Sequence, residues 1–160
     1  EVVEKLIRPA LANGSIVICD RFIDSTVAYQ GYGRTLKNPE NEVEIHGKGV
    51  GIVEDLNEKA TGGVIPDLTI LVDIDPKIGL KRAFNKIEER AEKSEKKEDR
   101  FEKESLEFHM RVRHGFLETA EKNKDRFEIV DGRGEISVIH RTICDIIKEL
   151  FLRQNKGSNS

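Results

Sequence analysis

The chain has 160 residues, 36% of them charged, and a formal net charge of −3 at pH 7. This length is typical of one domain with a single core, and the slightly negative charge argues against a general nucleic-acid-binding surface. The sequence contains no apolar run of about 18 residues and no signal peptide, so we expect no membrane span and a cytoplasmic protein. The two cysteines, Cys19 and Cys144, fit this as reduced thiols, one in a predicted buried strand and one in a predicted helix.

The first predicted element is an amphipathic helix, because apolar residues from Val2 to Leu11 recur at helical spacing. Pro9 lies inside it and should kink it, and Asn13-Gly14 is a typical C-terminal stop. The helix starts at Glu1 without a capping residue, which indicates that its beginning is missing.

Residues 16–19 form a continuous apolar run, which is typical of a strand buried on both faces of a parallel sheet. Asp20 and Arg21 would lie at its carboxyl end, where open α/β sheets bind ligands. A carboxylate beside a guanidinium suits a site for a metal-bound water and an anionic oxygen. A purely structural Asp20–Arg21 ion pair is an equally good interpretation of the spacing.

A short helix is predicted next, with Ser25 in its first turn and Thr26, Tyr29 and Gln30 on neighbouring turns. The Gln30 carboxamide both donates and accepts, which suits the edge of a nucleobase. The alternative for Tyr29 is an ordinary core position.

The middle of the chain is predicted as an irregular loop or short hairpin over residues 35–48, a helix over 50–59 and a second buried strand over 68–72. We interpret the extra length at 37–47 as a surface insertion. Asp75 is the expected N-cap of the next helix, with Pro76 at its first position. Asp73 either steadies a site or only the strand end, and the structural role is favoured.

Residues 87–103 are dense in both signs of charge, which fits either a solvated helix or a mobile lid. A helix follows from residue 105, in which Arg111 and Arg113 either contact phosphates or are solvated. A third strand over 127–130 and a last helix over 136–151 complete the domain of residues 1–152. A disordered polar tail is predicted over 153–160. The four histidines have no zinc-like spacing, so we predict no metal ligands.

This alternation of strands and helices predicts an α/β fold, a parallel sheet with helices on both faces. The phosphate-binding pattern G-x-x-x-x-G-K-[ST] does not occur in the sequence. The run D-R-F-I-D-S-T-V-A-Y-Q-G-Y-G-R from Asp20 to Arg34 resembles the signature of thymidylate kinases. Further matches follow the family's order: E-x-x-I-R-P-A-L-A-N-G from Glu4, N-E-K-A-T-G-G from Asn57, P-D-L-T-I-L-V-D-I-D-P from Pro66 and D-R-F-E from Asp99.

The resemblance implies a P-loop kinase fold of three layers, without its N-terminal strand and P-loop in this chain, and the transfer of a phosphoryl group from Mg²⁺-bound ATP to dTMP. It implies a family homodimer and a lid at 87–103. The implied catalytic residues are Asp20, Arg21, Arg90 and Arg100. The implied dTMP-binding residues are Arg21, Ser25, Thr26, Tyr29 and Gln30, and those implied for ATP are Arg82 and Arg133.

Because the implied P-loop and half of the thymine pocket would lie upstream of Glu1, we expect the 160-residue chain alone to be inactive as a kinase. Two alternatives stay open. One is a related kinase acting on another nucleoside monophosphate. The other is a non-catalytic nucleotide-binding remnant or interaction module.

Overall fold

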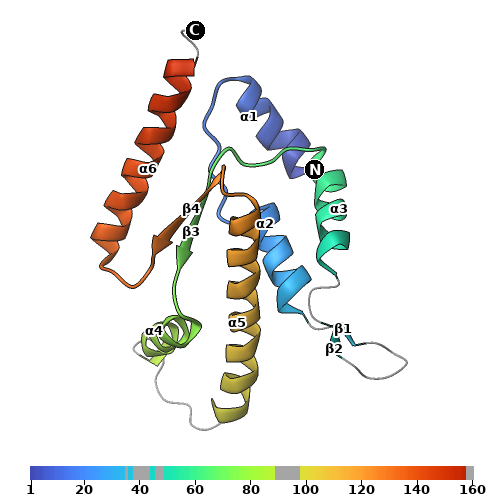
Figure 1. Cartoon of the computed structure of the whole chain (residues 1–160), viewed down its shortest axis with the longest axis vertical. Coiled ribbons are helices and arrows are strands. Elements are labelled where there is room, and N and C mark those ends of the chain that lie inside the picture. The colour runs from blue at the N-terminus through green and yellow to red at the C-terminus, as the bar shows by residue number, and fades with distance from the viewer. Residues whose placement is uncertain (35, 38–43, 46–48, 89–97, 158–160) are drawn as a thin grey trace.

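The computed structural model describes residues 1–34, 36–37, 44–45, 49–88 and 98–157, with only the backbone described for 36–37, 44–45, 84–88, 98–105 and 154–157 (Figure 1). It has a mixed α/β architecture with a small parallel sheet. The described helices are η1 (Val3–Ile7), α1 (Arg8–Ala12), α2 (Ile23–Thr26), η2 (Val27–Gly33), α3 (Val50–Thr61), α4 (Pro76–Glu88), α5 (Glu98–Lys122) and α6 (Ile136–Gly157). None of these is long and apolar enough to cross a lipid bilayer.

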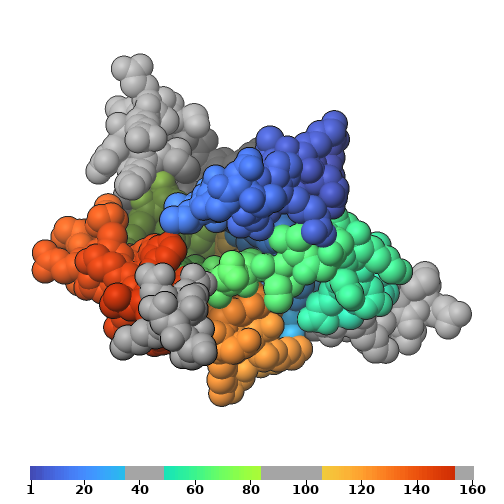
Figure 2. Space-filling view, turned by 90° about the horizontal axis from the view of Figure 1, so that it is seen from above, coloured from blue at the N-terminus to red at the C-terminus, as the bar shows by residue number. Residues whose placement is uncertain are grey.

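The parallel sheet consists of β3 (Thr69–Asp73) and β4 (Phe127–Asp131), with Thr69 opposite Phe127 and Asp73 opposite Asp131. The strands predicted over 68–72 and 127–130 are confirmed, but the first of them is not buried as predicted, because β3 is half-buried and Val72 is 44% exposed. In Figure 1, α6 lies on one side of this strand pair, and α5 and α2 lie on the other. Seen from above, η1 and α1 lie beside α3, away from α6 (Figure 2).

The prediction of a buried strand at residues 16–19 is wrong. The segment has no regular secondary structure, and Ile16 and Ile18 are 71% and 88% exposed. Cys19 is exposed as well, whereas Cys144 lies in the predicted helix, α6, where it is half-buried. A strand requires a neighbour for its ladder of hydrogen bonds, and among the described residues β3 and β4 pair only with each other. The apolar composition therefore indicated a segment suited to burial, but it carried no information about a neighbouring strand with which the segment could pair.

Helix termini follow the local sequence closely. The opening helix is divided into η1 and α1 just before Pro9, whose missing N–H is tolerated in a first helical turn. At the end of α3, Gly62 adopts the left-handed conformation (φ 59°) that ends many helices. The backbone N–H of Lys77 donates to Asp75 Oδ1 over 2.8 Å, which confirms Asp75 as the cap of α4.

The connecting segments are partly described. β1 (Leu36–Lys37) pairs antiparallel with β2 (Glu44–Ile45), so the predicted loop contains a short hairpin. Most of the proposed insertion at 37–47, and residues 89–97 of the charged segment, lie outside the described residues. Helix α6 continues through residues 153–157, which we had assigned to the polar tail, while 158–160 are not described.

The main helical contact joins α5 to η2, and glycines allow it to be close. A Cβ on Gly33 would lie 2.7 Å from Val112 Cγ2, and one on Gly115 would lie 2.7 Å from both Cβ and Cγ of Tyr32. Real Cβ atoms do not approach other carbons so closely, so each helix presents a notch to the other.

We predict that Gly115→Ala destabilises the fold by about 1–3 kcal/mol, because the new methyl meets the Tyr32 Cβ, which cannot move without the backbone. Gly51→Ala is the matched control, since Gly51 is also helical but has open space around its Cβ position. This control should gain about 0.5–1 kcal/mol from reduced backbone entropy in the unfolded state. Urea unfolding measures both changes, and equal stability of the two variants would contradict the close packing of α5 on η2.

Candidate active site

A cleft of about 540 Å³ opens beside α2 and η2. It is lined by residues of η1, α2, η2 and α3 and by the segment that leads into α2. The lining includes five predicted substrate-binding residues: Arg21, Ser25, Thr26, Tyr29 and Gln30. The other lining residues are Glu1, Val2, Val3, Phe22, Ile23, Asn57, Ala60 and Thr61. The structure therefore brings the five residues into one cavity, while their individual roles stay predictions.

Arg21 has an unusual backbone at the entrance to α2. Its φ is +73°, and it is the one non-glycine residue with positive φ in the described part of the chain. This conformation costs an L-residue about 1–2 kcal/mol. The Arg21 guanidinium lies 4.1 Å from the centre of the Tyr29 ring, which is cation–π geometry. Strained residues cluster at functional sites, so this outlier supports a functional role for Arg21.

Tyr29 is held by two aromatic rings of α5, neither of which lines the cleft. Its ring meets Phe108 and Phe116 edge to face, with centroid distances of 5.9 and 6.2 Å. Tyr29 is half-buried. It therefore makes the contacts expected of an ordinary core position and also exposes part of its surface to the cleft. Three contacts thus fix the orientation of the ring.

Asp20 is exposed and is not among the residues that line the cleft. Asp20 and Arg21, both described, form no ion pair with each other, so the interpretation as a structural pair is not supported. The predicted acidic residue and the predicted guanidinium therefore do not meet in this structure.

The carboxylate at the end of β3 is paired. Arg113 Nε and Nη2 donate to the two oxygens of Asp73 over 2.6 and 2.7 Å, and this bond raises the pKa of the guanidinium above its ordinary value. Arg111 Nε donates to the backbone oxygen of Gly33 over 3.0 Å. Both arginines of α5 bind protein acceptors, which favours structural roles for Asp73, Arg111 and Arg113 over phosphate contact.

Arg82 and Arg133, predicted to bind ATP, come together at the turn after β4. Arg82 donates to the backbone oxygens of Gly132 and Arg133 over 3.0 and 2.8 Å, so its guanidinium holds the turn. The Arg133 guanidinium and its backbone N–H both donate to Asp131 and lower the pKa of that carboxyl to about 2. Arg90 lies outside the described residues, and the Arg100 side chain is not described, so neither can be located relative to this turn.

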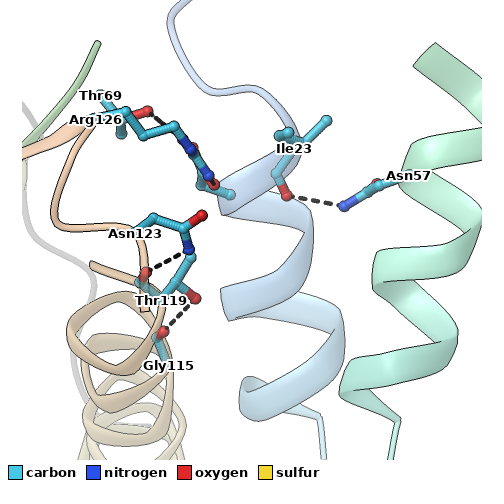
Figure 3. A network of polar contacts seen from close by, with 8 residues as sticks. Ile23, Asn57, Thr69, Gly115, Thr119, Asn123 and Arg126 are labelled. Atoms are coloured by element: carbon cyan, nitrogen blue, oxygen red, sulfur yellow. Dashed lines mark hydrogen bonds and ion pairs between the residues drawn. The ribbon is translucent and has the colours of Figure 1, made fainter. Parts of the chain in front are cut away.

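Sequence reasoning missed the polar contacts that hold the cleft in place. Arg126 forms a buried ion pair with Asp24, and the Asn57 side-chain nitrogen donates to the backbone oxygen of Ile23 over 3.1 Å (Figure 3). Asp24 and Arg126 are 102 positions apart, so no local pattern relates them. Arg8 Nη2 likewise donates to the oxygens of Thr61 and Gly62 at the end of α3. The quoted motifs contain Arg8 and Asn57, but a motif does not identify the partners of its residues.

Comparison with known proteins agrees with this architecture. The sequence model of the family described as thymidylate kinase matches residues 1–143. Thymidylate kinases of Solidesulfovibrio magneticus and Geotalea daltonii are 41% and 48% identical to the chain, over 93% and 81% of its length. These alignments cover 65% and 54% of the two relatives, so the chain spans between half and two thirds of their length.

The fold of the chain also matches that of a solved thymidylate kinase structure. The crystal structure of thymidylate kinase from Ehrlichia chaffeensis superposes with a TM-score of 0.58 at 30% sequence identity, and the match covers 91% of this chain and 56% of that one. Sequence and structure agree along most of the chain, and the chain belongs to the thymidylate kinase family.

Proposed function

We propose that this protein transfers the γ-phosphoryl group of ATP to the 5′-phosphate of dTMP and so forms dTDP in the cytoplasm. The observation that carries the proposal is the cleft, in which Arg21, Tyr29 and Gln30 line one cavity of a thymidylate kinase family chain. Phosphoryl transfer requires mainly positioning and charge neutralisation, which are the properties that these side chains supply.

Arg21 is the proposed clamp for the phosphate of dTMP. The Arg21 guanidinium lies over the Tyr29 ring, 4.1 Å from its centre, and a cation–π contact of this kind does not use up the N–H donors of the guanidinium. Arg21 donates no hydrogen bond to another described residue. A planar fork fixed in this way suits bidentate contact with phosphate oxygens.

Tyr29 and Gln30 are the proposed selectors of the nucleoside. Steric selection requires a side chain that cannot move away from the ligand. Tyr29 meets this requirement because Phe108, Phe116 and Arg21 contact its ring. In this proposal its ring excludes a 2′-hydroxyl. Gln30 and Thr26, exposed in the same cleft, offer a carboxamide and a hydroxyl to the thymine edge, and Ser25 completes the wall beside them.

Mg²⁺ is the proposed metal, bound together with the phosphates of ATP. No group of three His, Cys, Asp or Glu side chains gathers among the residues that the structure describes. Mg²⁺ in kinases needs only one or two carboxylates beside phosphates and water, and the exposed Asp20 carboxylate fits this requirement. When bound, the ion neutralises charge on the donor phosphates. Asp20 would hold a water molecule of the ion.

The donor side of the proposal rests on the family alone. We propose that the sheet is extended into the three layers of P-loop kinases and that the charged segment 87–103 covers ATP with Arg90 and Arg100. Arg82 would support the turn that carries Arg133 beside the adenine. We also propose that two copies of the protein form a homodimer, as the family resemblance implies.

We predict that Arg21→Ala in the complete gene product raises the KM for dTMP and lowers kcat, each by about two orders of magnitude, because the acceptor phosphate loses a forked contact. Arg141→Ala, at an exposed position of α6 outside the cleft, is the matched control and should leave both constants within about twofold of the parent. Coupled steady-state assays that vary dTMP and ATP separately measure the effect. Kinetics of Arg21→Ala equal to those of the control would contradict the assignment.

We predict that Tyr29→Ala lowers the preference for dTMP over its ribonucleotide analogue by about tenfold or more, because the wall against the 2′-position is removed. Tyr29→Phe keeps the ring and its contacts, so it should retain the parent preference. The ratio of kcat/KM for the two nucleotides is the measurement, with dUMP, UMP and AMP tested alongside. A parent enzyme that prefers UMP or AMP would instead identify a related kinase of different specificity.

A further inference from the structure

One buried ion pair joins the acceptor side of the cleft to the parallel sheet. Arg126 Nη2 donates to Asp24 Oδ1 over 2.7 Å, and Arg126 Nη1 donates to Asp24 Oδ2 over 2.9 Å. The two side chains are only 11% and 8% exposed. Such a two-bond contact fixes the relative orientation of the carboxylate and guanidinium planes as well as their distance.

Thr69 ties this pair to the start of both strands. Its hydroxyl donates to Asp24 Oδ2 over 2.9 Å and accepts from Arg126 Nη1 over 3.1 Å. Its backbone N–H donates to the backbone oxygen of Arg126 over 2.7 Å, just before the register of β3 and β4 begins. Figure 3 shows Arg126 and Thr69 together, reaching toward the first turn of α2. The Asp24 carboxylate is thus bound to the most regular part of the fold.

Asp24 does not itself line the cleft, but its neighbours in the chain do. It lies in α2 between Ile23 and Ser25, which both line the cavity, and Arg21 is two residues before the start of this helix. Helix α2 has four residues and no side-chain cap, so it has little stability of its own. On its other side the Asn57 side chain binds the Ile23 oxygen (Figure 3). The orientation of α2 therefore depends on contacts with distant parts of the chain.

A role in stability alone explains this arrangement poorly. Burying two charges carries a desolvation penalty that offsets much of their attraction, so hydrophobic residues would hold a helix against a sheet equally well. Hydrophobic contacts, however, would not fix the rotation of the helix about its own axis. Directional bonds at the two oxygens of Asp24 restrict rotation of α2 about its axis, and that rotation determines which side chains face the cleft.

We propose that Asp24 and Arg126 are positioning residues of the acceptor site, which set the orientation of α2 so that Arg21, Ser25 and Thr26 face one ligand. Thr69 acts as the third member of this positioning cluster. The inference rests on the proposed function, because the ligand is taken to be dTMP.

The test is the kinetics of Asp24→Asn in the complete gene product. The variant keeps the size of the side chain and loses the charge and one acceptor oxygen, so α2 can rotate. We expect the KM for dTMP to rise about tenfold or more while the KM for ATP stays within about twofold. Val130→Ala is the matched control, since Val130 is buried (5% exposed) in the strand that follows Arg126. It should lower the melting temperature and leave both KM values unchanged.

Two further variants separate orientation from charge. Arg126→Lys keeps the charge but cannot make two parallel bonds, so it should resemble Asp24→Asn. Thr69→Val removes the hydroxyl at nearly constant shape and should raise the KM for dTMP about threefold, whereas Thr69→Ser should match the parent. If Asp24→Asn does not fold, the KM values for dTMP of Thr69→Val and Thr69→Ser test the inference in its place. Equal KM values for these two variants would contradict it.

The outcomes distinguish this inference from the proposed function. A parent enzyme without dTMP-dependent activity would refute the proposed function and the inference with it. An active parent whose Asp24→Asn and Arg126→Lys variants lose stability like Val130→Ala, with unchanged KM for dTMP, would refute the inference alone. Equal rises in the KM values for dTMP and ATP would refute it as well, because a disturbance of the whole fold affects both substrates.

Discussion

The cleft depends on how one helical segment, Ile23–Gly33, is held by the rest of the chain. Its first part is a four-residue α-helix and its second part is the seven-residue π-helix η2, and neither is an intrinsically stable unit. The contacts that hold it come from β3, from Arg126 just before β4, and from α3 and α5. They consist of the buried Asp24–Arg126 ion pair, a hydrogen bond from the Asn57 side-chain amide, and the aromatic contacts of Tyr29. Tertiary contacts rather than helix propensity therefore determine the geometry of the cleft.

The π-helical form of η2 has a consequence for the side chains that it carries. A π-helix completes a turn in more residues than an α-helix, so the angular spacing of Tyr29 and Gln30 differs from the one assumed in a sequence pattern. With this spacing the Tyr29 ring contacts Arg21 as well as Phe108 and Phe116. Rare helical turns of this kind are frequent at functional sites, in agreement with the strained backbone of Arg21.

Local signals predicted well the parts of the fold that local chemistry decides. The cap at Asp75, the two paired strands and the stop of α1 at Asn13-Gly14 each follow from a few neighbouring residues. The run at residues 16–19 failed because a strand needs a partner that its own composition does not specify. The pairs Asp24–Arg126 and Asp73–Arg113 were missed for a related reason. They join positions 102 and 40 residues apart, and a single sequence carries no signal of such proximity.

Helix α5 links the two halves of the proposed reaction. It begins at Glu98, inside the charged segment proposed to cover ATP, and its later turns hold Tyr29 through Phe108 and Phe116. Arg113 of the same helix is bound to Asp73 at the carboxyl end of β3. A helix fixed at these points cannot rotate locally without moving Tyr29, because the notches at Gly33 and Gly115 leave no space between α5 and η2. A rotation of the later turns of α5 would therefore displace Tyr29 and change the shape of the cleft.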